Sequence, residues 1–136
     1  MLTNSSLLKE HGYVNGKWVG DDADSRFDVT NAYTNEVIST LPDMGKKETD
    51  EAINAANEAW PDWRGRTAKE RAIILKKWFD LIMANQEDLA ILMTAEQGKP
   101  IAEARGEVGY GASFIEWFAE EGKRTYGDII PTPSND

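Results

Sequence analysis

The sequence of 136 residues contains no cysteine and a single histidine. The absence of cysteine excludes disulfide bonds, thiolate metal ligands and a thiol nucleophile within this chain. One histidine without cysteines or an acidic cluster does not make a metal site. We therefore interpret His11 as a surface residue of a polar arm, and we expect no metal ligands in the chain.

Long apolar runs are also lacking, so no segment is expected to cross a bilayer. Residues 1–10 have no basic region followed by an apolar stretch, which a signal peptide requires. The formal net charge of -9 argues against nucleic acid or an anionic membrane as a partner, because both attract basic surfaces. These absences favour a cytoplasmic protein that binds neither.

The first third of the chain predicts a polar arm, 1–12, followed by two β-hairpins, 13–42. Asn15-Gly16 lies between two short apolar runs and is the strongest sequence signal for a type I′ turn. A second extended pair follows, in which Asn35 is suited to a left-handed turn position and Pro42 ends the strand. The two strands of this second pair are expected at 27–29 and 36–41.

From Lys46 to about Tyr126 the hydrophobic period becomes helical. Pro61 is expected to stop the first helix. Thr67 and Glu70 form the pattern of a capping box at the start of the second. Gly98 is expected to take a left-handed conformation at the end of the third helix, with Pro100 just beyond it.

Each predicted helix carries an apolar stripe that we expect to face the core. The stripes comprise Ala52, Ile53, Ala56, Ala59 and Trp60; Ile74, Leu75, Trp78, Leu81 and Ile82; Leu89, Leu92 and Met93; and Val108, Ala112, Ile115, Phe118 and Ala119.

Residues 127–136 predict the start of a strand that prolines interrupt. Such a strand has no later partner in the sequence, which indicates a truncated element. The fold class expected from these patterns is α+β and mostly helical, with two small antiparallel β-pairs followed by about four helices. We expect a single structural unit over 1–136.

A glycine-rich run, Gly106 to Gly111, is the first candidate for chemistry. Its G-x-x-G-x-G order differs from the dinucleotide-binding fingerprint, and it follows no strand. Three glycines inside a helix each cost about 1 kcal/mol relative to alanine. Close packing against another element, in this chain or outside it, is the favoured explanation.

Two acidic residues one helical turn apart, Glu116 and Glu120, are the second candidate, because paired carboxylates can perform acid–base catalysis. No nucleophile or metal partner accompanies them. A solvated face, in which the acids near 120 pair with Lys123 and Arg124, is favoured. Lys99 has a sufficient electrostatic role at a helix C-terminus.

The ordered set of motifs resembles the N-terminal segment of the aldehyde dehydrogenase family, along nearly all of the chain. The matching residues are 15–18, 29–31, 36–38, 52–56, 63–64, 67–71, 74–75, 96–100 and 103–104. The run 113–124, continued at 126–128, is similar to the bacterial succinate-semialdehyde dehydrogenase branch. Ala32 and Asn35 depart from the family's usual proline and glycine, and both are turn substitutions.

The resemblance implies that a parent enzyme oxidises an aldehyde to a carboxylate with NAD or NADP. In that family a cysteine thiolate attacks the aldehyde, hydride passes to the nicotinamide, and a glutamate activates water. Those catalytic and cofactor-binding residues come later in the family's chain. We therefore expect no catalytic and no cofactor-binding residue here, no cofactor bound by this chain, and an inactive N-terminal portion.

The same resemblance implies that the helix 101–126 lines a substrate tunnel, with Tyr110 and Phe114 as its candidate lining residues. The implied partners are the remainder of the dehydrogenase chain and, in the parent, further copies in a homo-oligomer. The alternative, from another class, is a self-sufficient helical binding or assembly module that uses its glycine-lined helix and exposed aromatics as a protein-binding face.

Overall fold

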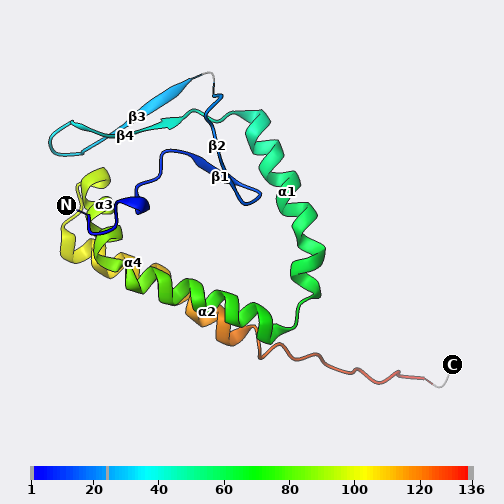
Figure 1. The fold of residues 1–136 in the computed structure, drawn as a ribbon. Coiled ribbons are helices and arrows are strands. Elements are labelled where there is room, and N and C mark those ends of the chain that lie inside the picture. The colour runs from blue at the N-terminus through cyan, green and yellow to red at the C-terminus, as the bar shows by residue number, and fades with distance from the viewer. Residues whose placement is uncertain (1, 24, 135–136) are drawn as a thin grey trace.

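The computed structural model describes residues 2–23 and 25–134, which form an open ring of helices and hairpins (Figure 1). A short 3-10 turn, η1 (Ser5–Leu7), precedes the strands β1 (Gly12–Val14), β2 (Lys17–Val19), β3 (Arg26–Thr30) and β4 (Val37–Pro42). The helices α1 (Lys46–Gly65), α2 (Ala68–Ala84), α3 (Gln86–Gln97) and α4 (Ile101–Glu121) follow. This architecture confirms the predicted fold class.

Both hairpins are antiparallel two-stranded sheets whose turns use the predicted residues. Asn15 and Gly16 have φ values of 48° and 78°, as a type I′ turn requires, and pair Tyr13 with Trp18 across the strands. In the second hairpin Asn35 has a φ of 60°. Its turn is fixed to α3 by a hydrogen bond of 3.0 Å from the Ala32 N–H to the Ala95 carbonyl.

Helix α1 differs from the prediction at its end, because it continues through Pro61 to Gly65. The expectation that Pro61 stops the helix is wrong. A proline inside a helix forgoes one backbone hydrogen bond and strains the preceding turn. The carbonyl that loses its partner belongs to Asn57, which is exposed, so water can bond it.

The two predicted helix caps are confirmed. The Glu70 N–H donates to the Thr67 hydroxyl, and the Thr67 N–H donates to the Glu70 carboxylate at 2.8 Å, which is a reciprocal capping box at the start of α2. Gly98 has a φ of 73° and donates its N–H to the Thr94 carbonyl, so it ends α3 in the left-handed conformation.

The capping box makes the stability of α2 depend on pH. The hydroxyl and the N–H of Thr67 hold the pKa of the Glu70 carboxyl below its ordinary value of 4.5. A carboxyl whose folded pKa is lowered contributes stability above its unfolded pKa and loses it as the pH falls through the folded pKa. This contribution is therefore present at neutral pH and lost below about pH 4.5.

We expect Thr67→Ala to lower the free energy of unfolding by about 1 kcal/mol at pH 7, as the loss of an N-cap does. The difference should shrink as the pH is lowered toward 3, because protonation of Glu70 removes the charged acceptor that Thr67 stabilises. Urea unfolding followed by circular dichroism at both pH values measures it. Thr49→Ala is the control, because that hydroxyl donates to the Gly45 carbonyl and to no carboxylate. An equal Thr67→Ala effect at both pH values would contradict the assignment.

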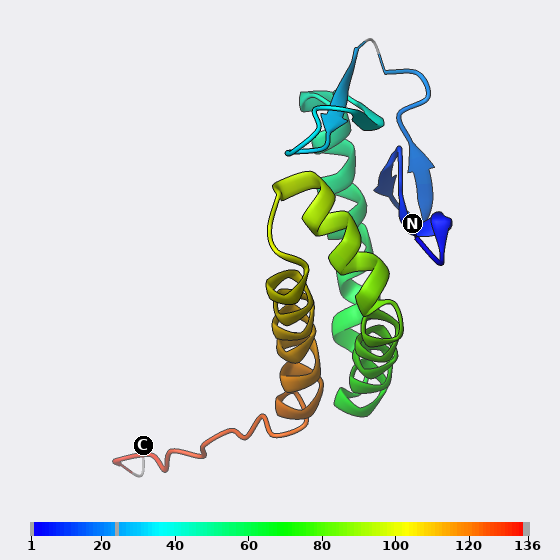
Figure 2. The ribbon, with the colours of Figure 1, turned by 90° about the vertical axis from the view of Figure 1, so that its left-hand side faces the viewer.

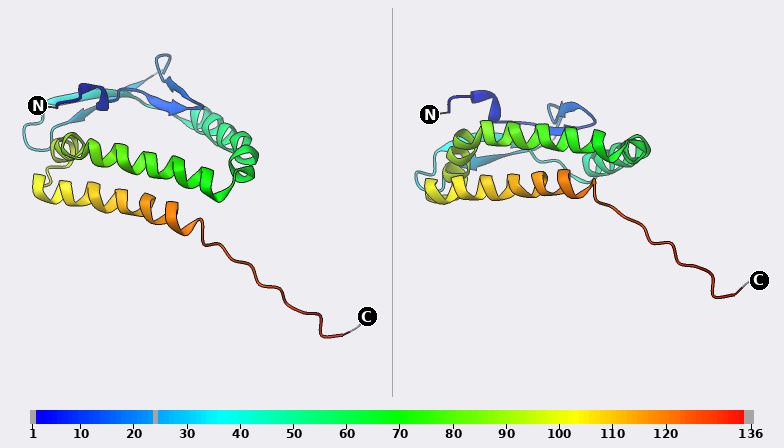
Figure 3. Two further views of the ribbon diagram at one scale, coloured as in Figure 1. Left: turned by 60° about the horizontal axis from the view of Figure 1, so that its bottom comes forward. Right: turned by 90° about the horizontal axis from the view of Figure 1, so that it is seen from below.

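Helices α2 and α4 lie side by side and antiparallel, and α3 joins them at one end (Figures 2 and 3). The buried centre is made of small residues: Ala90, Ala104 and Val108 form a cluster between α3 and α4, flanked by Ile82, Leu89, Met93 and Ile101. Among the described residues no large side chain is fully buried. The helices approach closely through alanines rather than through large interlocking side chains.

The predicted core stripes are only partly buried. Val108, Ala112 and Ala119 of α4 are buried as expected. The expectation is wrong for another group, whose members are exposed: Ile53, Ala56, Ala59, Trp60, Ile74, Trp78, Leu81 and Phe118.

Helix α4 ends at Glu121, five residues before the predicted end near Tyr126. The Gly122 N–H bonds back to the Phe118 carbonyl and the chain then turns away. Residues 127–134, where a strand start is predicted, run away from the helices without a partner strand (Figure 1). The last two residues of the predicted strand, 135–136, lie outside the described residues.

Candidate functional site

The two candidate tunnel residues, Tyr110 and Phe114, lie one turn apart on the same face of α4. Their ring centroids are 4.9 Å apart and their planes meet at 80°, an edge-to-face contact. Tyr110 is 66% exposed and Phe114 is 48% exposed. The structure therefore brings the predicted pair together on an open surface, and their role in a tunnel stays a prediction.

Phe114 also lines a groove of about 660 Å³ along the C-terminal half of α4. Trp117 and Phe118, the residues one turn further on, supply most of the remaining apolar wall, and both are exposed. Arg124 lies at the far end, just beyond the helix. The groove is an apolar surface with a charged rim.

The rim charges are paired within the chain. Glu116 lies 3.2 Å from Lys76 of α2, Glu120 lies 2.8 Å from Lys123, and Glu121 lies 3.6 Å from Arg124. The hydrogen bond from Lys123 lowers the pKa of Glu120, and the one to Glu116 raises the pKa of Lys76. Glu120 and Lys76 are thus held in their charged forms, which suits ion pairs rather than proton transfer near neutral pH.

The predicted pairing of the acids near 120 with Lys123 and Arg124 is confirmed. Glu116 bonds across to α2 instead, a contact between residues 40 positions apart. The two carboxylates Glu116 and Glu120 therefore do not form a shared acid–base pair.

The glycine run lies inside α4, where backbone N–H groups bond to carbonyls of the preceding turn and are not free to bind a phosphate. A side chain built at Gly109 would lie 3.5 Å from Gln86 of α3. A side chain built at Gly106 or Gly111 would have no described neighbour within 4 Å other than the backbone of its own helix. The packing that we predicted for these two glycines is therefore absent between the described elements.

His11 lies near Asp21, with 2.7 Å between its Nε2 and a carboxylate oxygen. Within residues 2–23 and 25–134 no group of three or more histidine, cysteine or acidic side chains is placed to hold a metal ion. In the same part of the chain no helix is long and apolar enough to span a membrane.

The Lys99 side chain forms an ion pair with Glu107 of α4, so its charge is neutralised within the chain.

The sequence analysis missed one buried acid, Asp88, which is 5% exposed in the first turn of α3. Its two carboxylate oxygens accept hydrogen bonds from the N–H groups of Thr3 and Asn4, at 2.8 and 2.7 Å. An acid in the first turn of a helix is explained by the helix dipole alone. No local pattern could therefore link Asp88 to an arm 85 residues away.

The sequence profile of the aldehyde dehydrogenase family matches residues 18–136, which is most of the chain. This chain belongs to the aldehyde dehydrogenase family. The chain is 56% identical to the glutarate-semialdehyde dehydrogenase of Pseudomonas putida and 55% identical to the NADP⁺-dependent succinate-semialdehyde dehydrogenase of Escherichia coli. Both matches cover 96% of this chain and 27% of the relative's length.

Solved structures of the family have the same fold over this segment. The NADP-dependent enzyme of Escherichia coli matches 100% of this chain with a TM-score of 0.94 and 54% identity, and an aldehyde dehydrogenase of Brucella melitensis matches 98% with a TM-score of 0.93 and 56% identity. This chain covers 28% of each of those chains. It therefore has the fold of the N-terminal part of an aldehyde dehydrogenase, and the alternative of a self-sufficient module is not favoured.

Proposed function

We propose that this chain forms the N-terminal part of an NAD(P)-dependent dehydrogenase that oxidises a short aldehyde carrying an anionic group at its other end. One observation supports this substrate class above all. Three relatives of 52–56% identity are named for succinate semialdehyde, glutarate semialdehyde and 3-sulfolactaldehyde. Each of these molecules joins an aldehyde to a carboxylate or a sulfonate through a short carbon chain.

In this proposal the chain contributes scaffold rather than reacting groups. The family's nucleophile is a thiolate, and this chain has no cysteine. The thiolate, the glutamate base and the nicotinamide site belong to the part of the enzyme that matches the rest of the relatives' length. Hydride transfer from the substrate to NAD or NADP would take place in that part of the enzyme.

Tyr110 and Phe114 are the residues of this chain that we place nearest the substrate tunnel of the complete enzyme. Their exposed edge-to-face pair offers an apolar wall that suits the carbon chain of a semialdehyde. In a complete enzyme carrying this segment, Tyr110→Ala should raise KM for succinate semialdehyde while leaving KM for NADP unchanged. Unchanged kinetics for both substrates would remove Tyr110 from the tunnel.

We further place the complete enzyme in the cytoplasm as a homo-oligomer, with no nucleic acid or membrane partner. The net charge of -9 on this chain supports the last point for the part of the surface that the chain supplies, since both kinds of partner are polyanionic or carry anionic surfaces.

The purified chain alone is expected to give no NADP reduction with succinate semialdehyde, measured as absorbance at 340 nm, and no NADP binding in equilibrium dialysis. The Escherichia coli relative, assayed in parallel, is the positive control. The chain has no cysteine thiolate on which the covalent intermediate could form, so the rate should equal that of a blank without protein. Turnover above that blank would contradict the proposal.

A further inference from the structure

The turn between β1 and β2, Asn15-Gly16, has no part in the proposed function. Asn15 is the only asparagine of the sequence that glycine follows. Both turn residues are exposed. Among the described residues the Gly16 N–H donates to no acceptor, and a side chain built at Gly16 would meet only the Tyr13 hydroxyl, at 4.0 Å. The backbone nitrogen that follows Asn15 is therefore unbonded and sterically open.

An open backbone nitrogen after asparagine is a nucleophile beside a side-chain amide. When this nitrogen attacks the side-chain carbonyl carbon, Cγ, a five-membered succinimide ring forms. The bond from Cγ to the amide NH2 breaks, and ammonia leaves with the proton of the attacking nitrogen. Water then opens the ring at either carbonyl, which gives an aspartyl residue or an isoaspartyl linkage whose backbone runs through the side chain. A following glycine favours the attack because it has no side chain to hinder it.

The ring closes only when the Gly16 nitrogen swings toward Cγ, so the turn must be able to leave its paired arrangement. The ribbon that holds the turn consists of two strands of three residues each, and an isolated two-stranded ribbon is marginally stable. The turn lies beside α1 (Figure 1), and a hollow of about 390 Å³ lies between it and helix alanines that include Ala52 and Ala55. The turn therefore has both the freedom and the space to open.

Asn35, in the turn of the second hairpin, shares the backbone conformation of Asn15 without its reactive neighbour. Asn35 is exposed, and its φ of 60° is close to the 48° of Asn15. The next residue, Glu36, carries a side chain, and its N–H donates to the Thr34 hydroxyl at 3.3 Å. The glycine and its unbonded nitrogen, rather than the left-handed conformation, thus distinguish Asn15.

We propose that Asn15 is a site of spontaneous deamidation, with water as the only co-reactant, and that the isoaspartyl product opens the β1–β2 hairpin. An isoaspartyl linkage adds one atom to the backbone of a two-residue turn, and the length of such a turn sets the register of its strands.

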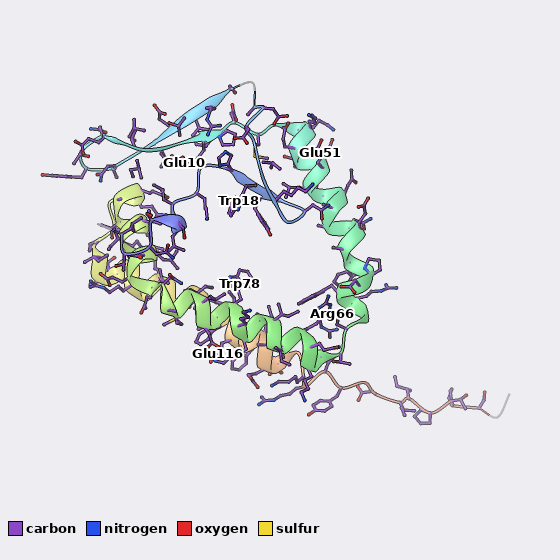
Figure 4. The ribbon with its side chains drawn as sticks, viewed as in Figure 1. Glu10, Trp18, Glu51, Arg66, Trp78 and Glu116 are labelled. Atoms are coloured by element: carbon purple, nitrogen blue, oxygen red, sulfur yellow. The ribbon has the colours of Figure 1, made fainter. Side chains whose placement is uncertain are left out.

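The loss of register separates the aromatic pair that closes the ribbon. Tyr13 lies opposite Trp18, with 5.0 Å between the ring centroids, and the Lys9 ammonium lies 4.7 Å from the centre of the Trp18 ring. Figure 4 shows Trp18 on this ribbon, pointing into the open space of the ring of helices and hairpins. The modification therefore releases Trp18 from both contacts.

The test incubates the purified chain at neutral pH and physiological temperature and samples it over time. Trypsin cuts after Lys9 and Lys17 and releases the peptide 10–17, in which Asn15 is the only asparagine. Mass spectrometry detects the exchange of NH2 for OH, and methyl transfer by an isoaspartyl methyltransferase detects the isoaspartyl form. We expect Asn15 to react at least about tenfold faster than Asn35, a difference of about 1.4 kcal/mol in barrier.

Two variants test the role of the following glycine. In Gly16→Asn the turn keeps a residue that tolerates positive φ, but its side chain hinders the attack, so residue 15 should react as slowly as Asn35. In Glu36→Gly the hindrance is removed from the second turn, so the reaction at Asn35 should become faster.

Hydrogen exchange over residues 12–19 tests the opening of the hairpin. Exchange should become faster in the aged chain. Asn15→Asp is the matched control, because it introduces the charge of the product without lengthening the backbone, and its exchange should equal that of the fresh chain.

None of these measurements depends on dehydrogenase activity. The modification site is overturned if peptide 10–17 keeps its mass in the folded chain while a synthetic peptide of the same sequence reacts, because the fold then protects Asn15. Equal rates at Asn15 and Asn35, or an unchanged rate at residue 15 in Gly16→Asn, would also overturn it. Isoaspartyl formation without faster exchange over 12–19 overturns the opening of the hairpin.

Discussion

Replacing Asp88 by alanine is expected to release the N-terminal arm and to lower the free energy of unfolding by about 3 kcal/mol. The carboxylate accepts two backbone hydrogen bonds, from Thr3 and Asn4; Asp88 itself is buried, whereas Thr3 and Asn4 are exposed. A hydrogen bond to a charged group contributes about 1.5–3 kcal/mol, and two such bonds are lost here, although water can bond the exposed N–H groups of the released arm. No other described group bonds these two N–H groups.

Urea unfolding measures the loss, and limited proteolysis at Lys9 reports the release of the arm. Glu87→Gln is the control: Glu87 shares the first turn of α3, but its carboxylate bonds to Arg105 of α4. It removes a charge from the same helix end without touching the arm. Equal cleavage at Lys9 in Asp88→Ala and in the control would show that Asp88 does not hold the arm.

The features that could be predicted from the sequence are those that nearby residues determine. Asn15 and Gly16 set their turn by their own backbone preferences. Thr67 and Glu70 complete each other's hydrogen bonds within a single turn. Gly98 ends α3 because glycine adopts a positive φ without strain. None of these depends on the rest of the fold.

Burial could not be predicted in the same way, because a helical period identifies an apolar face and not the element that covers it. Helix α2 has two such faces. Ala72 is buried on one, with Leu75 half-buried near it, whereas Ile74 and Trp78 are exposed on the other. The periodicity of the sequence cannot rank these faces.

The candidate site was predictable only through family resemblance. Tyr110 and Phe114 are aromatic residues at helical spacing, which local physics explains as packing. The reacting groups of the family are not in this sequence, so no spacing of residues could indicate the reaction. The contact of Asp88 with the N-terminal arm could not be predicted for a different reason, because the acid and its two backbone donors are more than 80 residues apart in the sequence.

Helix α4 is positioned by its contact with α3, and this contact leads to a second large effect. Ala104 is 0% exposed and packs against Ala90, which is also 0% exposed. Ala104→Leu adds three carbon atoms where no space exists, and overpacking of this kind costs about 1–3 kcal/mol. We expect the upper end of that range, because both alanines are fully enclosed.

Ala102→Leu is the matched control, since Ala102 is exposed on the same helix and leucine is nearly as good a helix former as alanine. Thermal and urea unfolding of the two variants should therefore differ by most of the overpacking cost. Adding Met93→Ala to Ala104→Leu should restore part of the stability, because Met93 packs on the same cluster and its truncation returns volume. If Ala104→Leu and Ala102→Leu are equally stable, α3 and α4 are not in close contact through these alanines, and the position assigned to α4 with its aromatic groove is wrong.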